Sequence, residues 1–286
     1  MIALCPNPFR DLDLKLTREC MTMLEQAGFS CAICPVFADD EPEALPEDLQ
    51  YQKLMELASD CSLAIVIGGD GTILSVVRQL RSESIPMLGI NLGTKGFMAN
   101  LEPEDLDRIV PAAKGEYRLS KRMMLEVELR RNGEMICRDH ALNDVVLHGY
   151  GDCIGMTTTC NGDRVSQFSG DGIILSTPTG STGYSMSAGG PIVEPEAACI
   201  ILTPICTFRL AARSFVLTDD REVRIRSIDQ GDKEVMLSVD GVPVPFLDGD
   251  ELIVRRSKQA LLMARVSDRS FYDIVFEKLN DKEDIK

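Results

Sequence analysis

The stretch "LAIVIGGDGTILSVV", residues 63–77, joins a strand-like apolar run to a helix-like one through a glycine-rich turn. Residues 63–67 are continuously apolar, which is typical of a strand buried on both faces of a parallel sheet. Beyond the turn a helix is expected to begin near Ile73, because apolar residues recur at helical spacing at Ile73, Leu74, Val77 and Leu80. A strand that passes through glycines into a helix is typical of an α/β domain.

The turn itself, "GGDGT" at residues 68–72, has the features of a phosphate-binding loop. Its glycines let a ligand approach the backbone, and the following helix directs free N–H groups and its positive dipole end toward the loop. The turn matches neither GxxxxGK nor GxGxxG. The residues alone leave two interpretations open: a phosphate-binding loop, or a tight turn in which Asp70 caps the helix with help from Thr72.

The two halves of the chain follow different periodicities. Residues 1–117 alternate short apolar runs with helical patterns, which indicates an α/β domain built on an open parallel sheet. Residues 118–266 follow period two and predict a β-rich domain. The tail, residues 267–286, has a helical pattern and is expected to dock back on the first domain.

The β-rich half contains two strong hairpin signals. Asn132-Gly133 and Asn161-Gly162 have the composition that type I′ turns prefer, since both residues tolerate positive φ. The run "EMICRDHALNDVVLH", residues 134–148, is the expected partner strand of the first hairpin.

The charge balance limits the classes of partner. The chain has 30 Lys and Arg against 45 Asp and Glu, for a formal net charge of −15. It therefore lacks the basic footprint of a protein that coats nucleic acid or adheres to anionic membranes. No run reaches the roughly 18 apolar residues of a membrane span, and no basic leader is present, so we expect a cytoplasmic protein without nucleic-acid or membrane partners.

The ten cysteines are expected to be reduced thiols. One CxxC pair, Cys31 and Cys34, raises the question of a metal or redox site. Zinc would require a second pair or nearby histidines, but His140 and His148 lie far along the chain. Buried strand cysteines are the favoured interpretation, and no residue is predicted to bind a metal directly.

Two further segments suit a nucleotide. Residues 170–191 are rich in Ser, Thr and Gly around one aromatic residue, Tyr184. This composition offers many hydrogen-bond donors to a polar, planar ligand, but it also fits an irregular linker between sheets. Asn143-Asp144 places an amide beside a carboxylate, which suits either the vicinal hydroxyls of a ribose or a simple turn.

In this order and spacing the chain resembles the NAD kinase family over nearly its whole length. "GGDGT" alone is shared with lipid kinases and, loosely, with phosphofructokinases, and the long hydroxyl-rich segment makes the match specific. The matching segments are Asn7-Pro8, Gly68–Thr72, Asn91–Phe97, Ala141–His148, Asp171–Ile192, Val239–Gly241 and the tail "FYDIVFEKL". The resemblance implies a Rossmann-like α/β domain that carries the GGDGT loop and a C-terminal β-sandwich-like domain, with the site between them, usually in a homotetramer.

The resemblance also implies a reaction: transfer of a phosphoryl group from ATP or polyphosphate to the 2′-hydroxyl of the adenosine ribose of NAD. Asp70 matches the family's proposed proton acceptor and is expected, with Gly71, to contact NAD. Asn143 and Asp144 match the pair that holds the ribose, and Asp171 matches an acid toward the nicotinamide. The phosphate-contacting loop matches Gly68, Gly69, Gly71 and Thr72. The segment around the adenine matches Thr182, Gly183, Tyr184, Ser185, Met186 and Ser187.

The residue types suit this chemistry. Phosphoryl transfer needs positioning, neutralisation of phosphate charge and an in-line nucleophile. A carboxylate such as Asp70 can orient the hydroxyl and accept its proton. Because the protein is acidic, we expect a divalent cation, Mg²⁺, to supply positive charge at the phosphates, and we expect a homo-oligomer, a dimer or tetramer.

The chain departs from the family pattern at several positions. Asp144 is one methylene shorter than the usual Glu, and Gly183 stands where Ala is usual. Lys95 replaces an apolar residue and is either solvated or near a bound phosphate, with Phe97 as a further candidate in the same segment. Departures that concern the nicotinamide side are Ser169, Phe208 and Val242.

Two rival functions share Asp70. A lipid kinase would need an apolar cavity and a membrane-binding surface, and neither a basic nor an amphipathic segment suggests one. A non-catalytic dinucleotide-binding protein would use Asp70 only as a helix cap.

Overall fold

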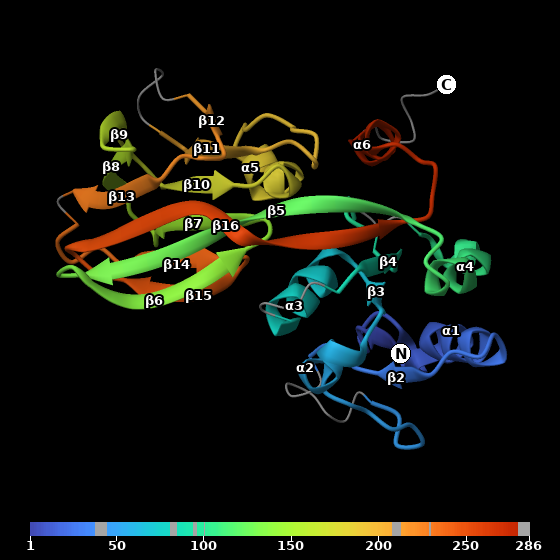
Figure 1. Ribbon diagram of the computed structural model, residues 1–286. Coiled ribbons are helices and arrows are strands. Elements are labelled where there is room, and N and C mark those ends of the chain that lie inside the picture. The colour runs from blue at the N-terminus through green and yellow to red at the C-terminus, as the bar shows by residue number, and fades with distance from the viewer. Residues whose placement is uncertain are drawn as a thin grey trace. The chain divides into compact units, whose positions relative to one another are not determined.

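A computed structural model of the chain describes residues 1–37, 45–80, 85–93, 96–99, 101–207, 213–228 and 230–279 (Figure 1). It divides into two compact units, Met1–Lys121 with Leu261–Lys286, here called the N-terminal unit, and Arg122–Ala260, the β unit. The boundaries expected at residues 117/118 and 266/267 lie at the start of β5 (Arg118–Arg131) and one residue beyond the end of β16 (Asp250–Arg265). The compact units divide a few residues inside these two strands.

The N-terminal unit is built on a parallel sheet with strand order β2-β1-β3-β4, followed by Met263 of β16 beside Met87. The strands are β1 (Ile2–Pro6), β2 (Cys31–Ile33), β3 (Leu63–Gly68) and β4 (Met87–Asn91). All of β3 is buried, as its uninterrupted apolar run predicted. The expectation of an open parallel sheet is confirmed.

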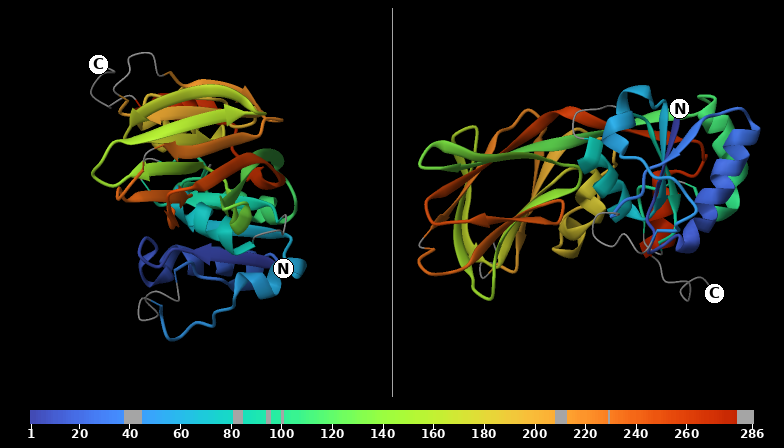
Figure 2. Two further views of the ribbon diagram at one scale, coloured as in Figure 1. Left: turned by 90° about the vertical axis from the view of Figure 1, so that its left-hand side faces the viewer. Right: turned by 90° about the horizontal axis from the view of Figure 1, so that it is seen from below.

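Helices cover both faces of this sheet (Figure 2). On one face, Cys20 and Leu24 of α1 and Ile109 of α4 join the apolar core with the strands. On the other, α3 packs on β3 and buries Ile73 and Val76. The helices of the unit are η1 (Leu12–Leu14), α1 (Lys15–Gln26), α2 (Leu54–Leu57), η3 (Ala58–Asp60), α3 (Asp70–Leu80), η4 (Pro103–Arg108), α4 (Ile109–Ala113) and α6 (Phe271–Leu279). The predicted helix in the tail is confirmed as α6.

The β unit consists of two sheets. The first has the order β6-β5-β16-β13-β8-β9 and the second β12-β11-β10-β7-β14-β15. Besides β5 and β16, the first contains β6 (Glu134–Ala141), β8 (Ile154–Cys160), β9 (Asp163–Gly170) and β13 (Val223–Ile228). The second contains β7 (Asp144–Gly149), β10 (Gly172–Ser176), β11 (Cys199–Ile205), β12 (Phe215–Thr218), β14 (Val235–Val239) and β15 (Val242–Phe246).

Alternate residues of the two sheets meet in one apolar core. Leu125, Val127 and Leu129 of β5 and Leu147 and Leu237 from the second sheet belong to the same buried cluster. Because strand side chains alternate between faces, every second residue points inward, and the period-two pattern is explained. The expected β-sandwich-like domain is confirmed.

Both predicted hairpins form, but the first partner strand is shorter than expected. Asn132-Gly133 connects β5 to β6 and Asn161-Gly162 connects β8 to β9, with positive φ at each of the four residues. The run 134–148 is not one strand, because β6 ends at Ala141 in the first sheet and β7 begins at Asp144 in the second. The chain changes sheets at Leu142-Asn143. In the ranges that the structure describes, no helix has the length and apolarity needed to cross a bilayer.

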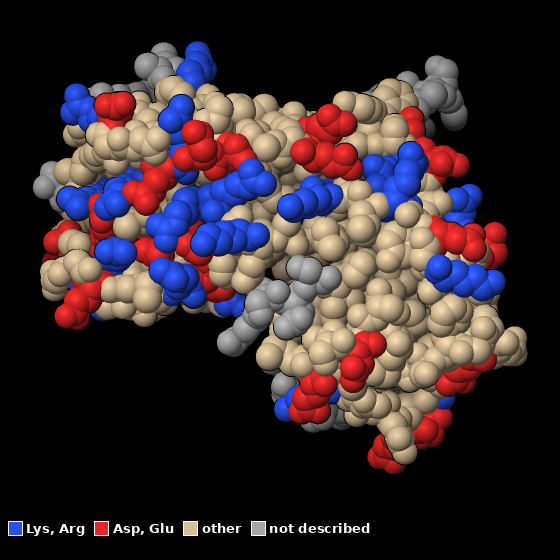
Figure 3. All heavy atoms as spheres, viewed as in Figure 1, with Lys and Arg blue, Asp and Glu red and all other residues tan. Residues whose placement is uncertain are grey.

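A charge network lies on the outer face of the first sheet, where basic and acidic side chains interleave (Figure 3). At its centre the Glu128 side chain is 1% exposed and receives hydrogen bonds from Arg130, Arg138 and Arg255. Burial alone would raise the pKa of Glu128, but the three guanidinium groups outweigh it and lower the pKa to about 2. The buried carboxylate is thus held in its charged form by three partners.

Replacing Glu128 with alanine should lower the free energy of unfolding by about 2 kcal/mol at pH 7, because three arginines lose their common acceptor. In the wild type, the contribution of Glu128 should be complete above the pKa of an unfolded glutamate, about 4.3, and should be lost as the pH falls toward 2. Urea unfolding of both proteins between pH 3 and 7 measures this. Glu126→Ala is the control and should cost less, since Arg255 is the one side chain found bonded to Glu126 among the described residues. Equal stability of Glu128→Ala and wild type across this pH range would contradict the predicted contribution of Glu128.

Candidate functional site

Three of the matching segments follow adjacent strands of the N-terminal unit. Asn7 follows β1, Gly69-Asp70 follows β3, and Asn91 ends β4. Since these strands are parallel neighbours, their carboxyl ends share one edge of the sheet. Open α/β sheets bind ligands at this edge, at the point where the strand order reverses. Here that point lies between β1 and β3, because β2 and β3 lie on opposite sides of β1.

The glycine loop is tighter than the sequence suggested, because α3 begins at Asp70 and not near Ile73. The backbone N–H groups of Thr72 and Ile73 both donate to the carbonyl oxygen of Gly69, at 2.9 and 3.2 Å, which closes the first turn. The buried Thr72 hydroxyl accepts from the Gly69 N–H at 3.3 Å and from Asn7 Nδ2 at 3.2 Å. Thr72 and Asn7 therefore fix the loop between β1 and β3.

Two glycines of the loop differ in what surrounds them. A Cβ atom at Gly68 would lie 2.3 Å from Thr72 Oγ1 and 2.8 Å from Thr72 Cβ, a severe overlap. A Cβ atom at Gly69 or Gly71 would have no atom of the described structure within 4 Å. Gly68 is thus required by the fold, and Gly69 and Gly71 line an open side where a ligand can approach the backbone.

This contrast predicts different defects for two matched variants. Gly68→Ala should lose about 1–3 kcal/mol of stability, because the new methyl group displaces Thr72. Gly69→Ala should stay within about 0.5 kcal/mol of the wild type and should raise the KM for the phosphoryl donor. Urea unfolding and steady-state kinetics of both variants measure this. An unchanged donor KM in Gly69→Ala would show that phosphates do not approach the open side of the loop.

Asp70 is bonded to a neighbouring loop and does not cap its own helix. Its Oδ2 accepts from the Phe97 N–H at 2.8 Å and its Oδ1 from the Met98 N–H at 3.1 Å. Burial raises the pKa of Asp70, opposed by the N–H donors of residues 97–99 and by the charge of Lys278. The structure thus brings Phe97 together with Asp70. The raised pKa makes the Asp70 carboxylate more basic than that of an exposed aspartate. Lys95 lies outside the described residues.

Asn91 is a residue that sequence reasoning did not single out. It is 3% exposed, its Oδ1 accepts from the Gly93 N–H at 3.0 Å, and its Nδ2 donates to Glu102 at 3.1 Å. A Cβ at Gly96 would lie 3.0 Å from Asn91 Oδ1 and 3.0 Å from Asp70 Oδ1. Asn91 therefore shapes the loop that carries the N–H donors to Asp70, and its place at a strand end was the available signal.

A second group of predicted residues lies at one end of the central strands β7 and β10 in the second sheet of the β unit. Asp144 begins β7 opposite Ser176, the last residue of β10. Asp144 is 8% exposed, and burial, followed by the negative charge of Asp240, raises its pKa to about 7. Asn143 Oδ1 is buried and has no hydrogen-bond partner within the described ranges. A buried acceptor without a partner is rare in folded proteins and is expected where a ligand supplies the donor.

The hydroxyl-rich segment is ordered and lies beside this pair. It forms η5 (Thr179–Thr182) and α5 (Tyr184–Ser187). A Cβ at Gly183 would lie 3.9 Å from both Asn143 Nδ2 and Asp144 Oδ2, so an alanine here would narrow the space beside the pair. The structure thus brings Asn143, Asp144 and Gly183 together, and the linker interpretation of the segment is wrong.

The side chains of this segment divide between anchoring and exposure. Ser185 is buried and shares a hydrogen bond with Thr203 at 3.0 Å, which attaches α5 to β11. Thr182 Oγ1 donates to the carbonyl oxygen of Thr179 at 3.3 Å. Met186 is half-buried, whereas Ser187 and Tyr184 are exposed.

Asp171 lies at the other end of β10 from Ser176, next to two cysteines. The Cys153 Sγ lies 3.6 Å from Asp171 Oδ1, and the Asp171 carboxylate raises the pKa of the Cys206 thiol. Burial raises the pKa of Tyr184, and the charges of Cys206, Asp171 and Asp144 raise it further, so the phenol lies within electrostatic range of both acids. Of the departures, Ser169 lies on β9, Val242 begins β15, and Phe208 lies outside the described residues.

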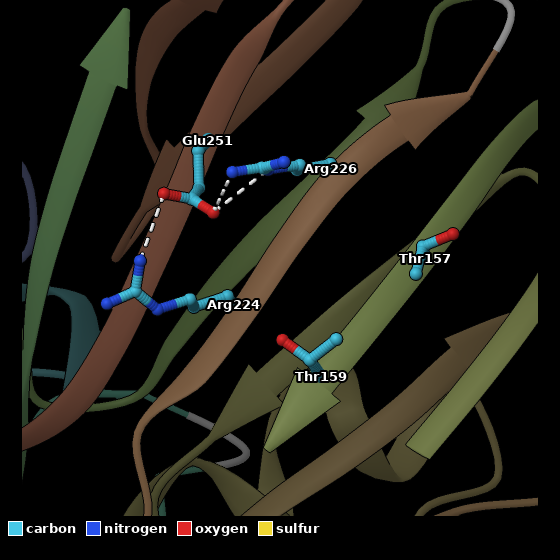
Figure 4. Close-up of a pocket in the computed structure, with 5 residues that line it drawn as sticks. All are labelled: Thr157, Thr159, Arg224, Arg226 and Glu251. Atoms are coloured by element: carbon cyan, nitrogen blue, oxygen red, sulfur yellow. Dashed lines mark hydrogen bonds and ion pairs between the residues drawn. The ribbon is translucent and has the colours of Figure 1, made fainter. Parts of the chain in front are cut away.

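A pocket of about 320 Å³ elsewhere in the β unit contains none of the predicted site residues (Figure 4). It lies on the outer face of the first sheet and is lined by Thr157, Thr159, Arg224, Arg226 and Glu251. Glu251 receives hydrogen bonds from Arg224 Nη1 at 3.2 Å and Arg226 Nε at 2.9 Å. Arg224 also pairs with Glu222 at 2.6 Å, so each arginine of the pocket has a carboxylate partner.

The CxxC pair consists of free thiols in or beside β2. Burial raises the pKa of Cys31 to about 11 and that of Cys34 to about 12, which disfavours the thiolate form. No cluster of three or more His, Cys, Asp or Glu residues suited to a metal ion occurs in the part of the chain that the structure describes.

Two family models match the parts of the chain that contain these two groups of residues. A family model described as the ATP-NAD kinase N-terminal domain matches residues 6–114, and one described as the ATP-NAD kinase C-terminal domain matches residues 142–266. A protein named NAD kinase from Acetivibrio thermocellus is 33% identical over 288 residues, 98% of this chain and 97% of the relative. Another from Geobacter sulfurreducens is 39% identical over 221 residues, 76% of this chain and 78% of the relative.

Two solved structures share the fold. A yeast NADH kinase complexed with NADH has a TM-score of 0.85 and 25% identity, with 97% of this chain and 86% of that chain covered. An NAD kinase from Archaeoglobus fulgidus in complex with ATP has a TM-score of 0.73 and 25% identity, with 97% of this chain and 98% of that chain covered.

Proposed function

Since this chain belongs to the NAD kinase family, we propose that it transfers a phosphoryl group from ATP to the 2′-hydroxyl of the adenosine ribose of NAD, giving NADP. The observation that carries the proposal is the environment of Asp70. Its carboxylate lies in the first turn of α3, held by two backbone N–H groups, beside glycines with an open side. This environment supports a role for Asp70 as a positioned base, next to a helix N-terminus suited to phosphate.

In this proposal Asp70 acts on the acceptor hydroxyl and the loop acts on the donor. A ribose hydroxyl is a weak nucleophile at neutral pH, and a carboxylate that accepts its hydrogen bond can take the proton as the new P–O bond forms. Because burial raises the pKa of Asp70, it is a stronger base than an exposed aspartate. The backbone N–H groups of Asp70 and Gly71, which have no hydrogen-bond partner among the described residues, suit the transferred phosphate.

We assign the ribose to Asn143 and Asp144. The buried, unpartnered Asn143 Oδ1 accepts a hydrogen bond from a hydroxyl, and Asp144, shorter than the usual glutamate, accepts another. The missing methyl group at Gly183 leaves space beside both side chains. The adenine is assigned to the α5 segment with exposed Tyr184, and the nicotinamide to the neighbourhood of Asp171. We further propose that the enzyme is a homo-oligomer in the cytoplasm.

Whether a divalent cation can bind to the protein itself depends on the side chains available as ligands. The described residues offer no ready group of three or more ligands, and the Asp70 oxygens already accept backbone N–H groups. Mg²⁺ often binds mainly through substrate phosphates, with one or two carboxylates and water completing its shell. We therefore propose that magnesium enters as the complex of the donor, where it neutralises phosphate charge, and not as a resident ion of the protein.

The position of phosphorylation has a direct test. The product formed from NAD and ATP should be reduced by an NADP-specific dehydrogenase supplied with its own hydride-donating substrate, since such enzymes recognise a 2′-phosphate. A phosphorylated product that this enzyme does not accept would place the phosphate elsewhere on NAD. Incubation with diacylglycerol or a sphingoid base should give no phosphorylated lipid, and such a product would instead support the lipid kinase alternative.

A further inference from the structure

We propose that Asp240 is a positioning residue, whose carboxylate holds the corner Leu142–Asp144 so that Asn143 and Asp144 face NAD. The inference rests on the proposed function and adds a residue whose role the motif match did not assign. Asp240 Oδ2 accepts from the Leu142 N–H at 2.6 Å, and Oδ1 accepts from the Asn143 and Asp144 N–H groups at 2.8 and 3.0 Å. One carboxylate thus binds three successive amides, almost 100 residues earlier in the chain.

The corner needs such a clamp because it lies between two sheets. β6 ends at Ala141 and β7 begins at Asp144, so the intervening amides have no strand partner of their own. On the opposite side, Thr177 Oγ1 donates to the Leu142 carbonyl oxygen at 2.5 Å and the Thr177 N–H to the Asn143 carbonyl oxygen at 2.9 Å. Every backbone polar group of Leu142 and Asn143 is therefore held by Asp240 or Thr177.

The side chains of the corner contrast with its backbone. Asn143 Oδ1 is buried without a partner in the described structure, and no hydrogen bond to the Asp144 carboxylate is found there either. A rigid backbone that carries unpaired polar side chains is the arrangement expected of a preorganised binding site. The internal bonds hold the main chain, and the side-chain acceptors are left for a ligand.

The turn alone does not explain an aspartate at this position. Asp240 and Gly241 form the turn between β14 and β15 with φ of +45° and +83°. Asparagine tolerates this conformation at least as well as aspartate. What aspartate adds is a second acceptor oxygen and a negative charge beside Asp144. The titratable groups that face the pair are Tyr184 near Asp144 and Asp139 near Asp240.

Asp240→Asn should therefore weaken NAD binding while the β14–β15 turn persists. Asparagine keeps one acceptor oxygen and turns an NH₂ group toward a backbone N–H, so the corner loses at least one bond. We expect the dissociation constant for NAD, measured by titration calorimetry without donor, to rise about tenfold. In kinetics the KM for NAD should rise and the KM for ATP should not. The pH at which NAD binding is half-lost should also move downward, because Asp144 no longer faces a negative charge.

Two further variants separate positioning from stability. Asp250→Asn is the matched control, since Asp250 is also a buried acid of the β unit that accepts a backbone N–H, from Leu247 at 2.9 Å. It should lower stability and leave NAD affinity unchanged. Thr177→Val removes a bond from the other side of the corner and should reproduce the Asp240→Asn effect, even if Asp240→Asn fails to fold.

The outcomes are distinguishable from failure of the proposed function. If the wild-type protein binds no NAD, the proposed function fails. If the wild type binds NAD and either Asp240→Asn or Thr177→Val binds it equally well, the positioning role is overturned. A rise in the KM values for NAD and ATP together, in proportion to lost stability, would likewise reduce Asp240 to a structural residue.

Discussion

Asp70→Asn should bind NAD with nearly wild-type affinity and turn over about 10²–10⁴-fold more slowly, the usual contribution of a positioned general base. Asparagine has the size of aspartate and keeps one oxygen for the Phe97 or Met98 N–H. It cannot take a proton from the ribose hydroxyl at neutral pH. The measurements are kcat with saturating NAD and ATP, and the NAD dissociation constant by calorimetry.

A matched control is available in the same unit. Asp11 is also a buried aspartate, and it accepts the Leu16 and Thr17 N–H groups, each at 2.9 Å, at the start of α1. Asp11→Asn should lower thermal stability and leave kcat per folded molecule unchanged. If Asp70→Asn turns over like the wild type, Asp70 is a structural link between α3 and the loop at residues 96–99, and the proposed mechanism is wrong.

Asp144→Asn should weaken NAD binding and stabilise the fold above neutral pH. A hydrogen bond to a charged acceptor is worth about 1.5–3 kcal/mol, so the loss of NAD affinity at pH 8 should be about 10- to 150-fold. The folded-state pKa of Asp144 is about 7, against about 3.9 for an unfolded aspartate. Ionisation therefore costs stability progressively as the pH rises from about 4 through 7, and the whole cost is present above 7. Asparagine removes it and should add roughly 1–3 kcal/mol at pH 8.

The pH dependence provides the sharper comparison. Wild-type affinity for NAD should fall as the pH drops below about 7, approaching tenfold per pH unit, because protonation removes an acceptor. The profile of Asp144→Asn should be flat between pH 5.5 and 8.5. Parallel profiles for the two proteins would show that Asp144 does not titrate in contact with the ligand, and unchanged stability at pH 8 would show that its charge is not buried.

Patterns that depend on near neighbours could be predicted from the sequence. The buried β3 strand has a continuous apolar run, and Asn132-Gly133 and Asn161-Gly162 determine their turns locally because they permit positive φ. The helix in the tail follows from its own periodicity. Each of these features needs only the residues within one element and its turn.

Features that depend on distant contacts could not be predicted. The change of sheet at Leu142-Asn143 interrupts an apolar run whose periodicity continues, and it is fixed by Asp240 almost 100 residues later. The start of α3 at Asp70, three residues earlier than expected, depends on hydrogen bonds to the Gly69 carbonyl oxygen. A glycine-rich sequence does not indicate whether such bonds form. The Asp70 contacts with Phe97 and Met98 likewise join α3 to a loop more than 25 residues later.

The candidate site shows the same division. The glycine loop suggested phosphate from local composition, but Asn143-Asp144 is also an ordinary turn sequence. Only the family resemblance assigned a ribose to the pair, and the unpartnered Asn143 oxygen then supplied a physical reason for a ligand there. Asp240 carries no local signal, because it acts through the backbone of a segment almost 100 residues earlier, and the available signal for Asn91 was its place at a strand end.

The most direct test of the central claim is the initial rate of NADP formation from NAD in the presence of Mg²⁺, measured in parallel reactions with ATP or polyphosphate as the donor. Wild-type protein should form NADP with ATP, and Asp70→Asn should form it at least about a hundredfold more slowly. Activity with polyphosphate would add a second donor without altering the role of Asp70. No NADP above a heat-treated control with either donor would contradict the proposed reaction.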